Sequence, residues 1–528
     1  MNVSNDLLHL IGAMTSQEKR YFKLYAAFYN KNAGNHCLQL FDSIDRYKPA
    51  NDTELEALVR DKPYGRRLAA LKNQLMELVL DSLAAFHASR QESFKLRRLL
   101  THAEILYNKG LYNHCRKLLA RAEKKAVETQ YYDFMPEIFT SKRALLIKEV
   151  SDSFEQDIEA LYKNNDTVLS LLLSTNSYLK LMDLMQVIAA RYAVRPTDED
   201  IRAIKAIAEH PLLNGETQAE TFGAQLARYN TLGTYSLLIN DIEQATEHYR
   251  NAVHLWKQSP ALIRQRPSQY RRYLLNYLNC LLTVPNEEEF ISVTRDIKAL
   301  PFPFPEQEPA ALATIWNIEL LYYLNRGELD KGAEVIAEVE KGLTRHADVL
   351  LPTTYITLCY NSTMFYFLAG NYRKALEYVN AILNERRIEI KRDLHDFARV
   401  LGLITHYELH NIDILDNMLR STRRFLRQRD TVGGLENIVL CAIKDLLFSV
   451  DQTSEQHIFR SLYKELTAII HSSDNQELPG MTELLFWTES KLRKRPIGGI
   501  FVEKIKVGSN MTPQTMFPLE PVFMSKKG

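Results

Sequence analysis

The sequence is organised around a short unit that recurs along most of its length, in which two amphipathic segments are joined by a tight turn. The clearest copy contains the string GNYRKALEY, which begins at Gly370. An apolar, aromatic segment stops at Gly370 and Asn371, and a second segment then places Ala375, Leu376 and Val379 on one stripe. Glycine adopts turn conformations that a β-carbon disfavours, and alanine lets two helices approach closely. The unit therefore predicts a helix, a turn and a second helix.

A marker residue early in each second helix repeats at a nearly constant interval of about 40 to 45 residues. The first of these markers is Ala245, and steps of the same interval counted back from it along the sequence reach Cys115. A constant period indicates that each helical hairpin buries its apolar face against its neighbours. We therefore predict an all-α fold, an α-solenoid that runs from about residue 95 to about residue 430. The markers are Ala245, Phe290, Gly332, Ala375 and Leu415.

The composition agrees with long helices and narrows the class of protein. The 19 Gly and 18 Pro in 528 residues are too few for an all-β chain with frequent turns. A formal net charge of +1 favours neither nucleic acid nor an acidic membrane as a general partner. The sequence shows no signal peptide, no membrane-spanning run and no CxxC pair among its five cysteines. We expect a cytoplasmic protein with reduced thiols and no membrane partner.

The sequence pattern divides the chain into four parts. Residues 1–90 predict an N-terminal helical domain, 91–433 the helical repeats, 434–495 C-terminal capping helices and 496–528 an extended tail. The tail begins with GGIFVEKIKV, which alternates with the period of a β-strand, and its Pro- and Met-rich remainder carries no helix signal.

Two stretches of the repeat region differ from the regular unit. Phe134 to Tyr162 and Thr167 to Tyr192 are expected to form two separate long segments. The prolines between Leu300 and Pro309 predict an extended connector, because proline fixes φ and removes a backbone donor.

Several of the repeats resemble the tetratricopeptide (TPR) family, whose pattern is W-x2-L-G-x2-Y followed by a conserved Ala and an aromatic residue. In the copy that begins at Tyr229, Ser236 stands where the pattern has its second aromatic residue. In the copy that begins at Trp316, Trp316 and Tyr323 keep both aromatic positions, and Gly332 stands where Ala is usual. The resemblance covers roughly two-thirds of the chain. It departs from the family in a period longer than about 34 residues and in lacking the Pro that usually ends a repeat. The copy that begins at Tyr229 matches the spacing of the family pattern, with Tyr in place of the usual Trp. Its matching residues are Tyr229, Leu232, Gly233, Ala245, Tyr249 and Ala252.

This resemblance implies a right-handed solenoid with a concave groove for an extended peptide or a protein partner. In peptide-binding TPR proteins the first helices of successive hairpins line the groove, and Asn side chains hold the ligand backbone. By resemblance, Asn230, Asn317 and Asn361 occupy comparable positions, with Met364 and Phe367 as apolar contacts. The matched Lys and Arg of the family's carboxylate clamp are not found.

A run of arginines provides a second candidate binding surface. Arg420, Arg423, Arg424 and Arg427 follow the spacing i, i+3, i+4, i+7, which places four guanidinium groups on one helical face. Like charges so placed repel one another, so either neighbouring carboxylates or an anionic partner should offset them. Both explanations remain open from the sequence. A second basic cluster precedes the tail and consists of Lys491, Arg493, Lys494 and Arg495.

Residues 1–90 allow two interpretations. A short helix ELEALVR, the turn DKPYG and a longer helix are compatible with a helix-turn-helix module, in which Arg66, Arg67 and Lys72 would contact DNA. Alternatively, these helices cap the solenoid, as repeat arrays require. Thr15 and Glu18 form the T-x-x-E signature of a capping box at the start of one of the helices.

The sequence carries no motif that identifies an enzyme. It contains no phosphate-binding Gly loop, nucleophile elbow or HExxH string, and HYELH supplies only His406 and His410 as potential metal ligands. We therefore expect no catalysis, no cofactor and no metal site. The expected function is a scaffold that binds a peptide or protein partner. The alternative is a nucleic-acid-binding regulator that reads DNA through residues 1–90. A third hypothesis, a metal- or phosphate-dependent hydrolase, rests on HYELH and the arginines.

Overall fold

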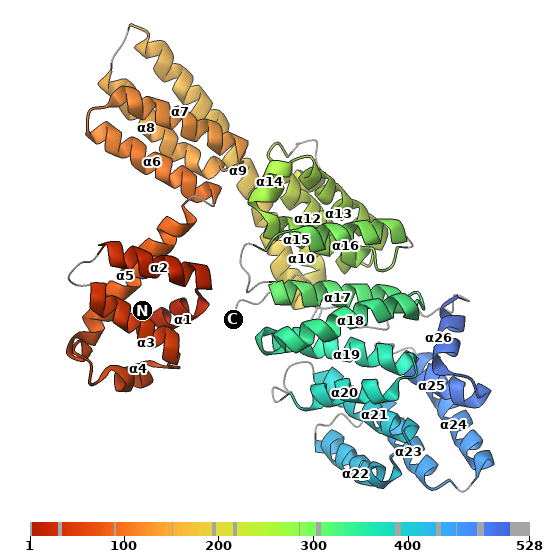
Figure 1. Cartoon of the computed structure of the whole chain (residues 1–528). Helices are drawn as coiled ribbons and strands as arrows, with labels where there is room; N and C mark the ends of the chain where they lie inside the picture. The colour runs from red at the N-terminus through yellow and green to blue at the C-terminus, as the bar shows by residue number, and fades with distance from the viewer. Residues whose placement is uncertain are drawn as a thin grey trace. The chain divides into compact units, whose positions relative to one another are not determined.

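The structure is a computed structural model of the 528-residue chain, and its described part is helical, without a β-strand (Figure 1). By contact, the chain forms two compact units. The first comprises Met1–Leu184, Glu209–Arg228 and Leu255–Arg266, and the second Met185–Ala208, Tyr229–His254 and Pro267–Gly528. The described residues are 3–29, 34–88, 91–149, 152–192, 197–214, 219–284, 286–302, 308–385, 392–428, 435–449, 451–471 and 480–506.

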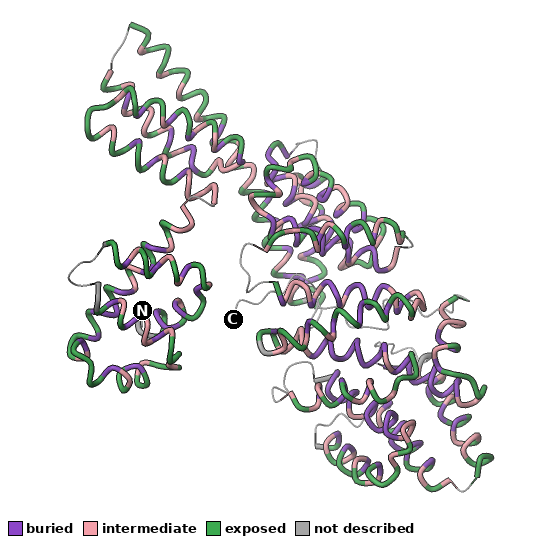
Figure 2. Tube along the Cα trace, viewed as in Figure 1, coloured by how far each residue is buried: buried purple, intermediate pink, exposed green. Residues whose placement is uncertain are grey.

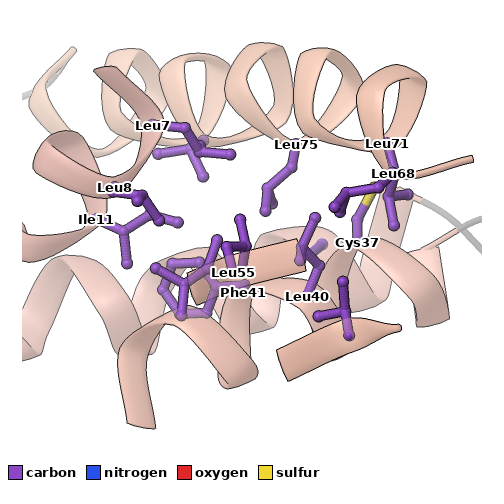
Figure 3. Packing of buried hydrophobic residues seen from close by; sticks show 14 of the residues in the cluster. Leu7, Leu8, Ile11, Cys37, Leu40, Phe41, Leu55, Leu68, Leu71 and Leu75 are labelled. Carbon is purple, nitrogen blue, oxygen red and sulfur yellow. The ribbon is translucent and has the colours of Figure 1, made fainter. Parts of the chain in front are cut away.

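The first part of the first unit has its own apolar core. Buried side chains between Leu7 and Val79 form one cluster, and Figure 3 shows side chains from α1, α3, α4 and α5 meeting in it. The capping box is confirmed: Thr15 N donates to Glu18 Oε2 at 2.7 Å, and Glu18 N donates to Thr15 Oγ1 at 3.3 Å. The helices are α1 (Val3–Ala13), α2 (Ser16–Tyr29), α3 (Gly34–Tyr47), α4 (Asp52–Val59) and α5 (Leu68–His87).

A second core in the same unit lies among the next helices, from Leu96 to Val168. The expected break between Tyr162 and Thr167 is wrong, because α9 continues through it. The run Asn164-Asn165-Asp166 contains neither Gly nor Pro, and its polar side chains do not interrupt a helix. The helices are α6 (Glu92–Asn108), α7 (Tyr112–Glu128), α8 (Met135–Lys148) and α9 (Phe154–Tyr192).

The middle of the chain contains shorter helices. The connector expected between Leu300 and Pro309 ends before Pro309, which is the second residue of the helix that follows. Proline is tolerated there, because the N–H groups in the first turn of a helix have no hydrogen-bond partner within the helix. Residues 303–307 of that connector lie outside the described ranges. The helices are α10 (Asp198–Ala208), α11 (Pro211–Asn214), α12 (Phe222–Leu238), α13 (Ile242–Lys257), α14 (Pro260–Gln265), α15 (Pro267–Cys280) and α16 (Glu287–Ala299).

In the second unit, α17 packs against α18 and α19, α19 against α20, and α21 against α20, α22 and α23. Helices α17 and α19 are buried around most of their circumference (Figure 2). They are apolar on nearly every face, which is typical of a helix surrounded by neighbours. The helices are α17 (Glu308–Leu324), α18 (Leu329–His346), α19 (Pro352–Leu368), α20 (Tyr372–Leu383), α21 (Arg392–Glu408) and α22 (Ile412–Gln428).

The joints between paired helices share one backbone geometry. The second or third residue after the first helix has a positive φ, and the next N–H donates to the carbonyl oxygen five residues earlier, at 2.8 to 3.0 Å. This is the Schellman motif, which satisfies carbonyl groups at a helix end. The helix, turn and helix predicted around Gly370 are thus confirmed. The positive-φ residues are Gly110, Asn240, Gly327, Gly370 and His410.

The last helices correct the prediction for the tail. Residues 497–506 form a helix instead of a β-strand, because Ile497, Ile500 and Phe501 share one helical face and are all buried. Gly498 allows this helix to approach α19, since a β-carbon there would lie 2.9 Å from the Leu368 carbonyl oxygen. Residues 507–528 lie outside the described ranges. The helices are α23 (Leu435–Leu447), α24 (Gln452–His471), α25 (Met481–Arg493) and α26 (Ile497–Lys506).

Candidate functional site

The arginine face lies on α22, a strongly amphipathic helix. Leu415, Leu419, Thr422 and Leu426 are buried on one side of it, at spacings of three and four residues. With that side fixed against neighbouring helices, the arginines are held on the other side. The structure therefore brings together the four residues that the sequence grouped, on one rigid element. We call Arg420, Arg423, Arg424 and Arg427 the arginine face.

The four guanidinium groups differ in their partners. Arg420 pairs with the carboxylate of Asp416, one turn earlier on the same helix. Arg424 and Arg427 are exposed, and no carboxylate in the described ranges lies within ion-pair distance of either. Part of the positive charge of α22 thus has no counter-charge within the described protein.

Arg423 is half-buried beside α23. One of its Nη atoms lies 3.9 Å from the Cys441 Sγ, and its buried Nε has no hydrogen-bond partner among the residues that the structure describes. A thiol is a weak acceptor, so most of the five N–H donors of this guanidinium remain available. Cys441 is the exposed cysteine of the chain, and no motif in the sequence indicates that it lies beside an arginine of another helix.

A further arginine, from α21, lies against another side of α22. The Arg399 guanidinium stacks on the ring of Phe425 at 3.8 Å from its centroid, and Phe425 belongs to α22. This contact keeps a further cation next to the helix that bears the arginine face.

The second basic cluster has a different environment. Lys491 Nζ lies 2.6 Å from Glu408 Oε2, Arg493 pairs with Glu489 and Glu503, and Arg495 pairs with Glu503. These contacts hold the end of α25 to α26 and α21, and they hold the Glu503 pKa below its ordinary value. Intramolecular ion pairs therefore account for Lys491, Arg493 and Arg495, which gives these three residues of the cluster a structural role.

The residues assigned to a groove by resemblance are largely inaccessible. Met364 and Phe367, which the resemblance assigned as ligand contacts, are fully buried in α19, because that helix is enclosed by its neighbours. Asn230 and Asn361 are also buried. Asn361 Nδ2 donates to Asn317 Oδ1 at 2.7 Å, so these two amides connect α19 to α17.

The residues assigned to DNA contact do not form one surface. Lys72 is buried and paired with the carboxylate of Asp52, because it lies on the same side of α5 as Leu68 and Leu75. It is therefore not available to DNA. Arg66 and Arg67 are exposed, but they lie in the 3₁₀ turn η1 (Gly65–Arg67) before that helix. Exposed positions of α5 carry Asn73, Gln74, Glu77 and Asp81 instead.

The HYELH string does not present two histidines on one helical face. Helix α21 ends at Glu408, and His410 takes the positive-φ position of the turn, with φ 56°. His406 is buried, which lowers its pKa, and its Nδ1 lies 3.0 Å from Asn411 Nδ2. Across the described residues, no three His, Cys, Asp or Glu side chains come together as metal ligands.

None of the helices in the described ranges combines the length and the apolarity that a membrane crossing requires. No protein-family model and no curated protein matches this sequence.

Proposed function

We propose that the protein is a non-catalytic interaction protein, and that it binds an acidic segment of a protein partner through the arginine face of α22. The proposal rests on one observation: Arg424 and Arg427 are exposed without a carboxylate partner among the described residues. The comparison with residues 491–495 supports it, since most of those cations are neutralised within the chain.

Electrostatics favours a carboxylate-bearing partner. Arginines at spacings of three and four residues repel by a few tenths of a kcal/mol per pair, and a bound anion removes that cost. The planar guanidinium also accepts a carboxylate in a two-bond arrangement. Arg423 adds donors that the Cys441 thiol does not satisfy. A partner with several Asp or Glu residues can therefore pair with more than one arginine at once.

The geometry of α22 determines how far apart the acidic residues of such a partner must lie. From Arg420 to Arg427 the axis of α22 advances by about 10 Å, or two turns. Each exposed pair contributes about 1 kcal/mol or less, so measurable binding requires several pairs together. Exposed pairs are also screened by salt, and the affinity should fall as ionic strength rises.

The test is binding of a fluorescently labelled poly-glutamate peptide to the full chain, followed by anisotropy across a salt series. We expect salt-sensitive binding that falls about tenfold or more in an Arg424→Glu/Arg427→Glu double variant. The matched control is Lys341→Glu/Arg345→Glu, which reverses two exposed cations without a described partner on α18. This control should bind as the wild type does.

Two results would contradict the proposal. If both double variants lose the same affinity for poly-glutamate, binding depends only on the net charge of the protein and not on the arginine face. Binding of labelled duplex DNA, with no binding of poly-glutamate, would favour the nucleic-acid alternative instead.

A further inference from the structure

Helix α9 carries a stripe of exposed side chains, and at its N-terminal end the Tyr162 ring packs edge-on against Phe139 of α8, with 5.2 Å between the ring centroids. Val168 and Tyr178 of this helix are buried, and Val168 belongs to the core shared with α6, α7 and α8. The stripe lies on the opposite side. Its positions advance by steps of three or four residues, which keeps them on one helical face. They are Tyr162, Asp166, Leu169, Leu173, Ser177, Lys180 and Leu184, and all are exposed.

The apolar members of the stripe are large and strongly exposed. Leu173 is 70 % exposed, Tyr162 and Leu184 are each 43 % exposed, and Leu169 is 39 % exposed. Isolated exposed leucines are common, but an apolar row along one helix indicates a helix-binding surface. The row from Tyr162 to Leu184 extends for about 33 Å along α9, since a helix rises 1.5 Å per residue.

The order of residues in the stripe is self-complementary. Asp166 and Lys180 lie equally far from Leu173 on its two sides, and so do Tyr162 and Leu184. Neither Asp166 nor Lys180 has an ion-pair partner among the described residues. If two such helices align in opposite directions about Leu173, each Asp166 faces the Lys180 of the other copy, and each Tyr162 faces a Leu184.

We propose that the protein self-associates through α9, as an antiparallel homodimer whose two-fold axis passes beside Leu173. A two-fold interface uses the same patch on both copies and therefore requires this self-complementarity. The two Leu173 side chains meet at the centre. The two symmetry-related Asp166–Lys180 pairs fix the antiparallel direction and the register, as flanking charges do in coiled coils.

The first test is the molar mass of the full chain, measured by sedimentation equilibrium over a dilution series. We expect a concentration-dependent equilibrium between the 61.1 kDa monomer and a dimer. Leu173→Asp should shift the protein to monomer at every concentration, while its circular dichroism stays helical. Leu179→Asp is the matched control, because Leu179 is an exposed leucine on another face of the same helix, and it should leave the dimer intact.

A charge exchange tests the register without removing an apolar side chain. Asp166→Lys and Lys180→Asp each place like charges opposite one another in a homodimer, so each variant alone should dimerise about tenfold more weakly. An equimolar mixture of these two variants restores both opposite-charge pairs in a heterodimer. The mixture should therefore associate as the wild type does.

Disulfide formation between engineered cysteines tests where the two-fold axis of the dimer lies. In a Cys441→Ser background, Leu173→Cys should form a disulfide-linked dimer on mild oxidation, because the two sulfurs meet on the axis. Lys180→Cys should not, since its two copies lie about 21 Å apart along the helices. The proposal is overturned by a monomer at all concentrations, by a dimer that persists in Leu173→Asp, or by a mixture that associates no better than its components.

Discussion

At the scale of single residues, the most unusual environment belongs to Glu483, in the first turn of α25. Its side chain is fully buried, and neither carboxyl oxygen has a hydrogen-bond partner on another residue of the described ranges. Burial disfavours the charged form and raises its pKa to about 7, from an ordinary value of 4.5. The folded protein therefore holds this proton more tightly than the unfolded chain does.

This proton makes the stability of the protein fall as the pH rises. The stabilising contribution is complete below about pH 4.5 and is lost as the pH passes through about 7, with a total change of about 3 kcal/mol. Glu483→Gln keeps the shape and removes the titration. We expect its free energy of unfolding in urea to decline less than that of the wild type between pH 5 and pH 8.

The exposed Glu334 of α18 supplies the control for this measurement. Glu334→Gln should give a curve of free energy of unfolding against pH that runs parallel to the wild-type curve. A parallel curve for Glu483→Gln as well would show that Glu483 does not titrate in this range.

Residue-level features were predictable where the determinants are local. The Thr15–Glu18 capping box and the turn at Gly370 depend on a few adjacent residues, and the structure confirms both. The burial of Lys72 and Glu483 was not predictable, because it depends on which face of a helix a distant segment covers. Charged residues on such helices are ordinarily solvated, so their type alone suggested exposure.

At the scale of the elements, the turns that join paired helices place different residues in the same backbone conformation. Gly370 has φ 75° and His410 has φ 56° at equivalent positions. A residue with a β-carbon is disfavoured there by about 1–2 kcal/mol, whereas glycine is not. The joint between α21 and α22 is therefore more strained than the joint between α19 and α20.

Exchanging these residues should change stability in opposite directions. His410→Gly should stabilise the protein by about 0.5–1 kcal/mol. Gly370→Ala should destabilise it by about 1 kcal/mol through backbone strain alone, because no atom lies within 4 Å of the added β-carbon. Urea unfolding of both variants provides the measurement, and shifts of the same sign would contradict this account.

Helix positions could be read from the sequence more reliably than helix ends. Helices α23, α24 and α25 all lie within residues 434–495, where helices were expected. The β-strand expected at GGIFVEKIKV failed because ten residues can satisfy an alternating and a helical pattern together, and packing on α19 decides between them. The recurring pattern predicted the helix, turn and helix around Gly370, but it could not tell that α19 is enclosed on most sides.

At the scale of the whole molecule, a net charge of +1 conceals an uneven local distribution. Lys491, Arg493 and Arg495 are paired with carboxylates, whereas Arg424 and Arg427 of the arginine face have no carboxylate partner among the described residues. The arginine face itself could be predicted from the sequence, because four residues on one helix suffice to define it. It could not show which of the two basic clusters finds partners, because those partners come from distant segments.

The two proposals combine at this scale. A dimer formed through α9 carries two arginine faces, so an acidic partner with two binding segments would gain affinity by engaging both. The monomeric Leu173→Asp variant separates the effects: it should keep single-site binding of poly-glutamate and lose only the gain from two sites.

The most direct test of the central claim is photo-crosslinking from the arginine face inside the protein's own cells. A photoreactive amino acid replaces Arg424 in one version of the full chain and Lys341 in another, and crosslinked peptides are identified by mass spectrometry. We predict that position 424 captures a defined partner through a segment rich in Asp and Glu, and that position 341 does not. Capture of the same proteins from both positions, or of segments without acidic residues, would contradict the assignment of the arginine face as the binding site.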